Sequence, residues 1–169
     1  MGGGELRVGA EEPAGPLPGG RRVTPARQLA ERFGDPAAMR SLYAPDVVWL
    51  ISASLGVPRL EGVEAVAAFN MQVWTEHHRP DCTVTILDEA GDDHRSAVRF
   101  TYRAWSHFRG DWYENEYSLF VRADDAGIRH VAEAFDTAAT IDFLAGRAAG
   151  SAWATVGGDA GDRVGALGR

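Results

Sequence analysis

Residues 112–120, WYENEYSLF, decide the fold class, because Tyr, Asn, Tyr and Leu stand at every second position with Glu, Glu and Ser between them. An Asp-Asp-Ala-Gly turn at 124–127 separates this stretch from a second alternating segment at 128–136. A period of two is typical of strands that bury one face. The two segments therefore predict a long antiparallel hairpin near the end of the folded unit.

One carboxylate in this hairpin stands on the apolar side. Val131, Glu133 and Phe135 share a face of the second strand, so Glu133 is expected to point where its two neighbours point. A carboxylate on a buried face is costly unless it is paired or protonated, and perturbed groups of this kind are common at functional sites. Glu133 is therefore the leading candidate for acid–base chemistry. The structural alternative is an ion pair with an arginine such as Arg99 or Arg103.

Composition excludes several classes of function. The 169 residues make about one domain, and a net charge of −7 offers no basic surface to nucleic acid. All 17 cationic residues are arginines, which excludes lysine Schiff-base chemistry and a P-loop lysine. The single cysteine, Cys82, suits a reducing cytoplasm, and no apolar run approaches the ~20 residues that span a bilayer. We therefore expect a cytoplasmic protein with no membrane partner.

Both ends of the chain lack apolar periodicity. Residues 1–22 are rich in Gly, Pro and Glu and residues 147–169 in Gly and Ala, so we expect a disordered extension and a flexible tail around a folded unit at 23–146. Within this unit, caps, turns and periodicity predict helices that start at Pro25 and Pro36 and span 63–78 and 138–144. The expected strands span 46–54, 81–89, 95–108, 112–123 and 128–136.

Helices first and a hairpin-rich run of strands later indicate an α+β fold. We expect a cone-shaped, curved antiparallel sheet wrapped around three N-terminal helices, with a ligand cavity at its open end. Trp49 on the first strand and Phe69 and Trp74 on the 63–78 helix are expected to form an apolar wall of this cavity.

Three short motifs, in this order along the chain, resemble those of a known family. They are LYAPDVVW at 42–49, LEG at 60–62 followed by EAV at 64–66, and Tyr113-x-Asn115-x-Tyr117 with Glu133 and Asp136-Thr137. In sequence and order they are similar to the first strand, the third helix start and the final hairpin of the nuclear-transport-factor-2-like superfamily. The SnoaL-like polyketide cyclase branch is most similar, and the likeness extends over about residues 29–143.

The resemblance implies an enzyme that acts on a small organic molecule as a homodimer. In SnoaL-like cyclases, limonene-epoxide-hydrolase-like enzymes and phenazine-pathway condensing proteins, an acid on the last strand acts as general acid or base, and that position matches Glu133. The condensing proteins place a tyrosine where Tyr113 falls. The epoxide hydrolases need an Asn, and the steroid isomerases an Asp, near Ile51, and the second carboxylate of the hydrolases would stand near Phe100 or Tyr102. Hydrolysis by water and steroid isomerisation are therefore disfavoured.

The resemblance, carried to these residues, implies a cofactor-free cyclase or isomerase of specialised metabolism with no metal. Glu133 is the expected general acid or base, and Tyr113 and Tyr102 are expected to assist it at the reacting oxygen. The expected substrate-binding residues are Trp49, Phe69, Trp74, Asn115, Tyr117, Val131 and Phe135.

Other interpretations stay open at this point. The alternative function is a non-catalytic small-molecule-binding or protein-interaction module of the same fold. Asn115 and Tyr117 can equally satisfy backbone groups. The adjacent histidines His77 and His78 point apart on a helix, which disfavours a shared metal ion.

Overall fold

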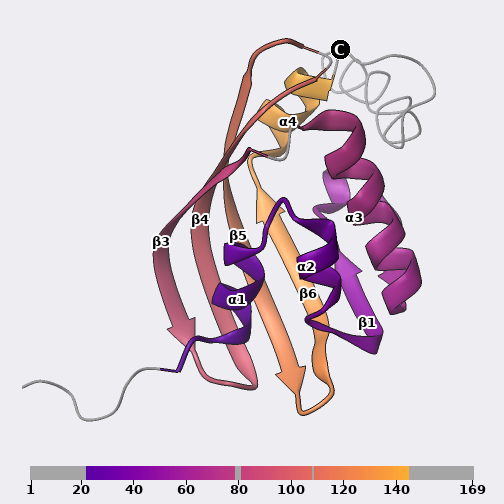
Figure 1. Cartoon of the computed structure of the whole chain (residues 1–169), viewed down its shortest axis with the longest axis vertical. Helices are drawn as coiled ribbons and strands as arrows, with labels where there is room; N and C mark the ends of the chain where they lie inside the picture. The colour runs from indigo at the N-terminus through magenta and orange to yellow at the C-terminus, as the bar shows by residue number, and fades with distance from the viewer. Residues whose placement is uncertain (1–21, 79–80, 108, 145–169) are drawn as a thin grey trace, which may run out of the picture.

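The computed structural model describes residues 22–78, 81–107 and 109–144 (Figure 1). The ends that we expect to be unstructured, at 1–22 and 147–169, lie outside these residues apart from Arg22, and so both stay predictions. In the described part of the chain, no helix is both long enough and apolar enough to cross a membrane.

The N-terminal helices begin where the sequence places a capped proline. The side chains of Thr24 and Asp35 each accept the backbone N–H three residues later, and they start α1 (Pro25–Glu31) and α2 (Pro36–Arg40). Proline suits the first helical turn, because its missing N–H would have no partner there. The longest helix, α3 (Val63–His77), confirms the helix expected at 63–78.

Within the described residues, six strands form one curved, unclosed sheet in the order β2-β1-β6-β5-β4-β3. Neighbours are antiparallel except β1 and β6, which run parallel. Figure 1 shows α1, α2 and α3 packed against one side of this sheet. The strands are β1 (Tyr43–Leu50), β2 (Leu60–Glu61), β3 (Thr83–Gly91), β4 (Arg95–Trp105), β5 (Trp112–Asp124) and β6 (Gly127–Phe135). The predicted α+β class and the predicted final hairpin, β5–β6, are both confirmed.

The first strand differs most from its expected bounds. Instead of 46–54, it spans Tyr43–Leu50 and is followed by one 3-10 turn, η1 (Ala53–Leu55). The strand starts early because the Ile128 N–H donates to the Leu42 carbonyl at 2.8 Å, which begins the parallel pairing with β6. This long-range pairing is invisible in the local pattern, and it brings the first strand beside the last one.

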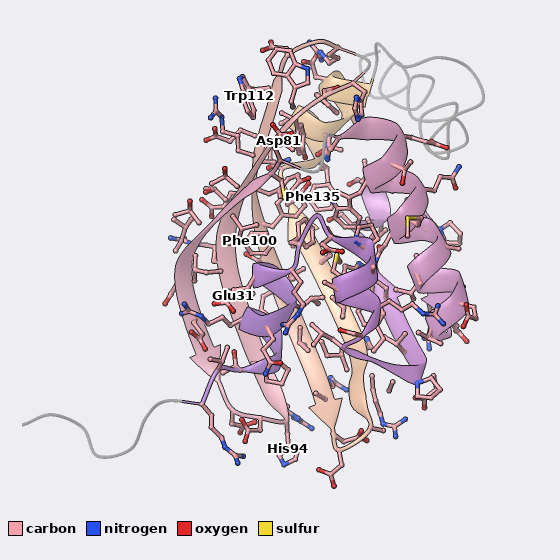
Figure 2. The ribbon with its side chains drawn as sticks, viewed as in Figure 1. Glu31, Asp81, His94, Phe100, Trp112 and Phe135 are labelled. Atoms are coloured by element: carbon pink, nitrogen blue, oxygen red, sulfur yellow. The ribbon has the colours of Figure 1, made fainter. Side chains whose placement is uncertain are left out.

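Alternation along β4 and β5 separates the two faces of the sheet. The inward side chains are buried, and they are Ser96, Val98, Phe100, Tyr102 and Ala104 on β4 and Tyr113, Asn115, Tyr117, Leu119 and Val121 on β5. Outward neighbours carry charge, as in the Arg99–Glu116 ion pair. Figure 2 shows Phe100 between the sheet and the helices and Trp112 at the margin of the molecule.

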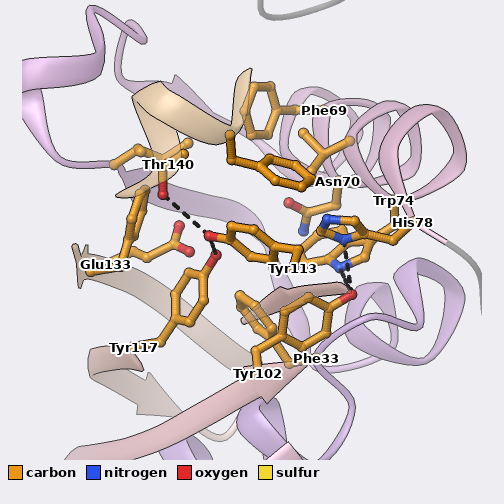
Figure 3. Close-up of a pocket in the computed structure, with 14 residues that line it drawn as sticks. Phe33, Phe69, Asn70, Trp74, His78, Tyr102, Tyr113, Tyr117, Glu133 and Thr140 are labelled. Carbon is orange, nitrogen blue, oxygen red and sulfur yellow. Dashed lines mark hydrogen bonds between the residues drawn. The ribbon is translucent and has the colours of Figure 1, made fainter. Parts of the chain in front are cut away.

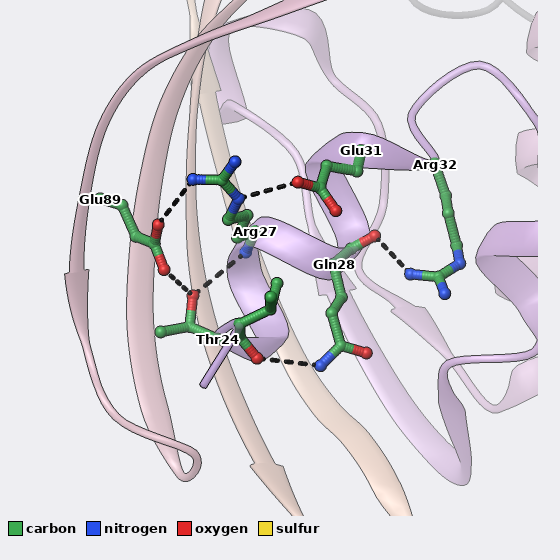
Figure 4. Close-up of polar contacts among 7 residues, drawn as sticks. Thr24, Arg27, Gln28, Glu31, Arg32 and Glu89 are labelled. Atoms are coloured by element: carbon green, nitrogen blue, oxygen red, sulfur yellow. Dashed lines mark hydrogen bonds and ion pairs between the residues drawn. The ribbon is translucent and has the colours of Figure 1, made fainter. Parts of the chain in front are cut away.

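A carboxylate on the concave face ties α1 to the edge strand β3. Glu89 accepts hydrogen bonds from Thr24 Oγ1 at 3.0 Å and from Arg27 Nη1 at 3.2 Å (Figure 4). Burial raises the pKa of Glu89, but the hydrogen bonds from Arg27 and Thr24 outweigh it and hold the pKa below its ordinary value. Arg27 also pairs with Glu31 at 2.8 Å, one turn along the same helix. This network fixes the position of α1 beneath the sheet.

Candidate active site

A pocket lies between the concave face of the sheet, α3 and the last described helix, α4 (Thr137–Leu144) (Figure 3). Its lining is Phe33, Ile51, Phe69, Asn70, Val73, Trp74, His78, Tyr102, Tyr113, Tyr117, Glu133, Phe135, Thr140 and Phe143. The cavity measures about 60 Å³, whereas sites for drug-sized ligands typically measure about 300–1,000 Å³. Aromatic rings therefore fill most of the space beneath the sheet, and a substrate of that size has to displace some of them.

Glu133 lies in this pocket. The β5–β6 register pairs it with the buried Leu119, so its predicted inward orientation is confirmed. Its Oε2 accepts a hydrogen bond from Trp49 Nε1 at 2.8 Å. The residue is half-buried, and burial raises the pKa of its carboxyl from 4.5 to about 7, although the hydrogen bond from Trp49 lowers it. Near neutrality the carboxyl therefore exists in both protonated and ionised forms.

The structural alternative, in which Glu133 forms an ion pair with an arginine such as Arg99 or Arg103, is wrong. Arg99 pairs with Glu116 at 3.4 Å and Arg103 with Glu114 at 3.5 Å, and both pairs lie on the outer face of the sheet. The residues that line the pocket include no arginine among those the structure describes. Glu133 therefore faces a mostly aromatic surface instead of a cation.

Two tyrosines of β5 place their hydroxyl groups near this carboxyl. The hydroxyl oxygens of Tyr113 and Tyr117 are 2.8 Å apart, and Thr140 Oγ1 of α4 lies 3.2 Å from that of Tyr113. Burial raises the pKa of both phenols, and the charge of Glu133 raises it further. Figure 3 shows the carboxyl of Glu133 turned toward the two hydroxyls. Both phenols therefore remain protonated at neutral pH. One of the two protons lies in the hydrogen bond between them, which leaves one that can be donated to an oxygen beside Glu133.

A second polar group stands at the other end of the pocket. Trp74 Nε1 donates to the hydroxyl oxygen of Tyr102 at 3.0 Å, and His78 Nδ1 lies 3.0 Å from the same oxygen. Burial raises the pKa of Tyr102 far above its ordinary value, so this phenol is also neutral. In Figure 3 the Tyr102 hydroxyl and His78 lie on the opposite side of the Tyr113 ring from Glu133.

A family model described as a SnoaL-like domain matches residues 27–131. The chain belongs to the SnoaL-like family. This membership confirms the resemblance to the nuclear-transport-factor-2-like superfamily that the three motifs indicate. A search of curated proteins finds no match.

Solved structures share the fold of this SnoaL-like domain at low sequence identity. A protein assigned to the SnoaL-like polyketide cyclases from Jannaschia sp. CCS1 is 12% identical, with 73% of this chain and 94% of that one covered and a TM-score of 0.58. BvnE pinacolase from Penicillium brevicompactum is 18% identical, with 71% and 86% covered and a TM-score of 0.61. PrhC from Penicillium brasilianum is 21% identical, with 72% and 88% covered and a TM-score of 0.58. At such identities the likeness shows the fold alone.

Most of the site residues expected from sequence line the pocket of the SnoaL-like domain. They are Glu133, Tyr113, Tyr102, Phe69, Trp74, Tyr117 and Phe135. Trp49, Asn115 and Val131 lie behind this lining. Trp49 holds Glu133, Val131 is in the core, and Asn115 Nδ2 donates to the Tyr113 hydroxyl at 3.0 Å. These three support the lining side chains, and direct contact between them and a substrate stays a prediction.

Asn115 also joins the strand to the last helix. Its Nδ2 donates to the Asp136 carbonyl at 2.9 Å, and its Oδ1 accepts from the Asp136 N–H at 3.3 Å. The carboxylate of Asp136 accepts the N–H groups of Ala138 and Ala139 and so caps α4. The backbone-satisfying role left open for Asn115 is therefore present, and it fixes where α4 starts above the pocket.

Sequence reasoning missed several lining residues. Phe33 and Ile51 enter the pocket from the α1–α2 connection and the end of β1, and Thr140 and Phe143 share a face of α4. No motif in the sequence indicates His78, which lies one residue after α3 and stacks its ring on Tyr113 with centroids 5.2 Å apart. The side chain of His77 lies outside the described part, and within that part no three His, Cys, Asp or Glu residues are grouped to hold a metal ion.

Proposed function

We propose that this SnoaL-like protein is a cofactor-free cyclase or isomerase in which Glu133 is the general acid and base. The reaction is ring closure within a polyketide- or terpenoid-like intermediate of specialised metabolism, by epoxide opening or an aldol-type step. One observation carries the proposal: a carboxyl with a pKa of about 7 lies in an aromatic pocket beside two neutral phenols. General acids work best when their pKa is close to the working pH.

The proposed chemistry balances without a co-reactant. Protonated Glu133 gives its proton to the substrate oxygen on which negative charge develops, while a nucleophile of the same substrate attacks the neighbouring carbon. The carboxylate that results takes up the proton that the nucleophile loses. The hydrogen-bonded pair of Tyr113 and Tyr117 donates its remaining phenol proton to the same oxygen, and general acid catalysis of this kind contributes roughly 10²–10⁴-fold in rate.

Opening of the pocket is part of the proposal, because the cavity of about 60 Å³ is too small for such an intermediate. The covering element is α4, whose Phe143 ring packs on Tyr113 with centroids 4.4 Å apart. Arg109 Nη1 donates a hydrogen bond to the Asp142 carbonyl of α4 at 3.1 Å. We infer that α4 moves outward to admit substrate and returns to exclude water from Glu133.

The small size of the cavity favours a second candidate function. A pocket that its own aromatic side chains nearly fill is compatible with a non-catalytic module that binds a small flat molecule or another protein. The fold alone does not distinguish the two candidates, because one fold can host many functions. The carboxyl of Glu133 favours the enzyme, because a binding module gains nothing from a buried acid with a raised pKa.

Metabolite profiling of a deletion strain tests the proposal. The strain is complemented with the wild type, with Glu133→Gln, or with Glu116→Gln, the matched control on the outer face of β5. We expect Glu116→Gln to restore the wild-type profile and Glu133→Gln to leave an uncyclised or unisomerised intermediate. A wild-type profile with folded Glu133→Gln would show that the catalytic proposal is wrong.

The accumulated compound also separates enzyme from binding module. Calorimetry with purified Glu133→Gln is expected to show binding of the intermediate without turnover. If wild-type protein binds the compound and leaves it unchanged, the binding module is the correct assignment.

We also propose that the protein is a cytoplasmic homodimer, as the family resemblance implies. On the outer face, Phe120 is 56% exposed and stands in register between Ala97 and Ala132 of the neighbouring strands. Sedimentation velocity of the wild type and Phe120→Asp tests this. A wild-type monomer would contradict the dimer, and a dimer of Phe120→Asp would contradict this surface.

A further inference from the structure

The pocket contains a second proton-transfer group that the mechanism above leaves unused. We propose that Tyr102 and His78 form a phenol–imidazole pair that removes a proton from the nucleophilic end of the substrate, while Glu133 protonates the other end. This inference rests on the proposed function and extends it from one acid–base residue to two separated groups. It assigns a role to His78, which no motif in the sequence indicates.

The hydrogen bonds around Tyr102 restrict where its proton can lie. An indole N–H only donates, so the bond from Trp74 Nε1 occupies one lone pair of the Tyr102 oxygen. The single phenol proton then needs an acceptor, and His78 Nδ1 lies 3.0 Å away. Cys82 also lies beside this hydroxyl, but sulfur is a weak acceptor, and Cys82 Sγ donates to the Phe33 carbonyl at 3.5 Å. We therefore assign the phenol proton to the bond with Nδ1, an assignment that places the proton of a neutral imidazole on Nε2.

His78 is held firmly enough for this role. It is the residue that follows α3, where its N–H bonds the Trp74 carbonyl at 3.3 Å, and its backbone forms an antiparallel bridge with Ser106 after β4. Its ring lies against Tyr102, Tyr113 and Phe143 at centroid distances of 5.4, 5.2 and 6.0 Å. The residue is only 8% exposed and still lines the pocket. Its imidazole is therefore fixed in orientation and mostly removed from water.

The two proton-transfer groups are separate. The charge of Glu133 raises the pKa of Tyr113 and Tyr117. The pKa of Tyr102 is instead raised by burial and by electrostatic interactions with Cys82 and Tyr113. Figure 3 shows the Tyr113 ring between the two ends. Separation matters, because a carboxylate close to the imidazole would exchange protons with it directly. The pocket can therefore hold an acid and a base in their active forms at the same time.

An aldol-type closure shows how the protons balance. A C–H bond beside one carbonyl breaks, its proton passes to the Tyr102 oxygen, and the phenol proton moves to His78 Nδ1. The released electron pair forms the new C–C bond at the second carbonyl carbon, whose oxygen takes the proton of Glu133. The product is an isomer of the substrate, and His78 and Glu133 return to their starting forms by proton exchange with water. The fitting substrate is an uncharged molecule with two carbonyl groups, since the described lining offers no arginine to an anion.

The first test observes the tautomer directly. Nitrogen-15 NMR of imidazole-labelled protein is recorded for the wild type, Tyr102→Phe and His78→Asn, which assigns the signal, with His130→Asn of the outer face as control. We expect an unprotonated Nδ1 and a protonated Nε2 on His78, and a shift of the Nδ1 signal in Tyr102→Phe. A proton on Nδ1 of the wild type would overturn the proposal.

The second test measures proton removal without ring closure. The probe is 2-tetralone in D₂O, an uncharged two-ring ketone whose exchange of C–H protons is followed by proton NMR. We expect Glu133→Gln to keep accelerating this exchange, and Glu133→Gln with His78→Asn to lose about 100-fold of it. Equal exchange with and without His78, or exchange at the buffer rate with every protein, would overturn the role of the pair.

The two proposals fail in different ways. If Glu133→Gln abolishes product formation while His78→Asn and Tyr102→Phe retain the wild-type rate, the proposed function stands and this inference is wrong. If the His78 and Tyr102 variants are inactive while Glu133→Gln retains the wild-type rate, the inference stands and the role of Glu133 is wrong.

Discussion

Glu89 and Glu133 are two carboxylates on the concave face of one sheet, and their surroundings give them opposite properties. The side chain of Glu89 is 11% exposed, yet its pKa is held below the ordinary value because Arg27 and Thr24 outweigh burial. Glu133 has a neutral indole as its hydrogen-bond donor, and burial raises its pKa to about 7. A cation within reach thus makes one carboxylate a structural anchor, and the lack of that contact leaves the other able to exchange protons.

The comparison also shows that position in the sheet decides the partner. Glu89 stands on the edge strand β3, where α1 brings an arginine over it. Glu133 stands on the central strand β6 beneath aromatic residues of α3 and α4. Burial alone therefore does not identify a functional acid, and the type of partner has to be known.

The largest expected difference between the two carboxylates is in catalysis. Glu133→Gln removes the transferable proton and keeps the shape, so turnover of the accumulated intermediate should fall by roughly 10²–10⁴-fold. Glu89→Gln should leave turnover within about threefold of the wild type, because it lies outside the pocket lining. Steady-state kinetics of the folded variants provide the comparison. Similar losses in both variants would remove the distinction between acid and anchor.

The next effect is on stability, and its sign follows from the raised pKa of Glu133. The folded state holds the proton more tightly than the unfolded chain, so stability of the wild type declines as pH rises from about 4.5 through about 7. Glu133→Gln has no titrating carboxyl at this position. Its free energy of unfolding should therefore rise relative to that of the wild type by up to roughly 3 kcal/mol above pH 8. Urea unfolding across this pH range gives the two curves. Parallel curves would show that burial does not perturb Glu133.

Glu89 should behave in the opposite way. Its pKa is lowered in the folded state, so its contribution is present above the ordinary pKa of 4.5 and is lost as pH falls through the folded value. Glu89→Gln should therefore lower the melting temperature by a few degrees at pH 7 and by little at pH 3. Glu31→Gln, which removes only the contact within α1, is the control. A loss that is the same at both pH values would mean that packing, and not charge, holds α1.

The smallest expected effect concerns the hydrogen bond between Trp49 and Glu133. The bond from Trp49 Nε1 lowers the pKa of this carboxyl against burial. Trp49→Phe should therefore raise the pKa further above 7 and extend the protonated form to higher pH. Carbon-13 NMR of the labelled carboxyl measures the shift, with Trp112→Phe on the outer face as control. A lower pKa in Trp49→Phe would show that the indole does not stabilise the carboxylate.

The sequence predicts the part of the site that local pattern controls. The two segments 112–120 and 128–136 alternate with period two, so the hairpin, the inward faces and the orientation of Glu133 follow from strand geometry. The caps at Thr24 and Asp35 likewise locate two helices, because capping depends on neighbouring residues only.

What the sequence does not predict depends on contacts between distant segments. The parallel β1–β6 pair gives Trp49 its role as donor to Glu133, across 84 residues of sequence. The position of His78 beside Tyr102 requires the end of α3 to meet the end of β4. The size of the cavity depends on how many rings enter it from five different elements. None of these follows from periodicity, since each is a property of the packed structure.

The pairing of β1 with β6 has a consequence for how the chain acquires its site during synthesis. The β3–β4 and β4–β5 hairpins join neighbouring segments, so they can form early, whereas β1 waits for the last strand to leave the ribosome. Until then Trp49 has no carboxyl to bond, and the edge of β1 opposite β2 has no strand beside it. A nascent chain that stops short of β6 is therefore a target for chaperones and self-association, and the proposed proton-transfer chemistry requires synthesis of the whole fold.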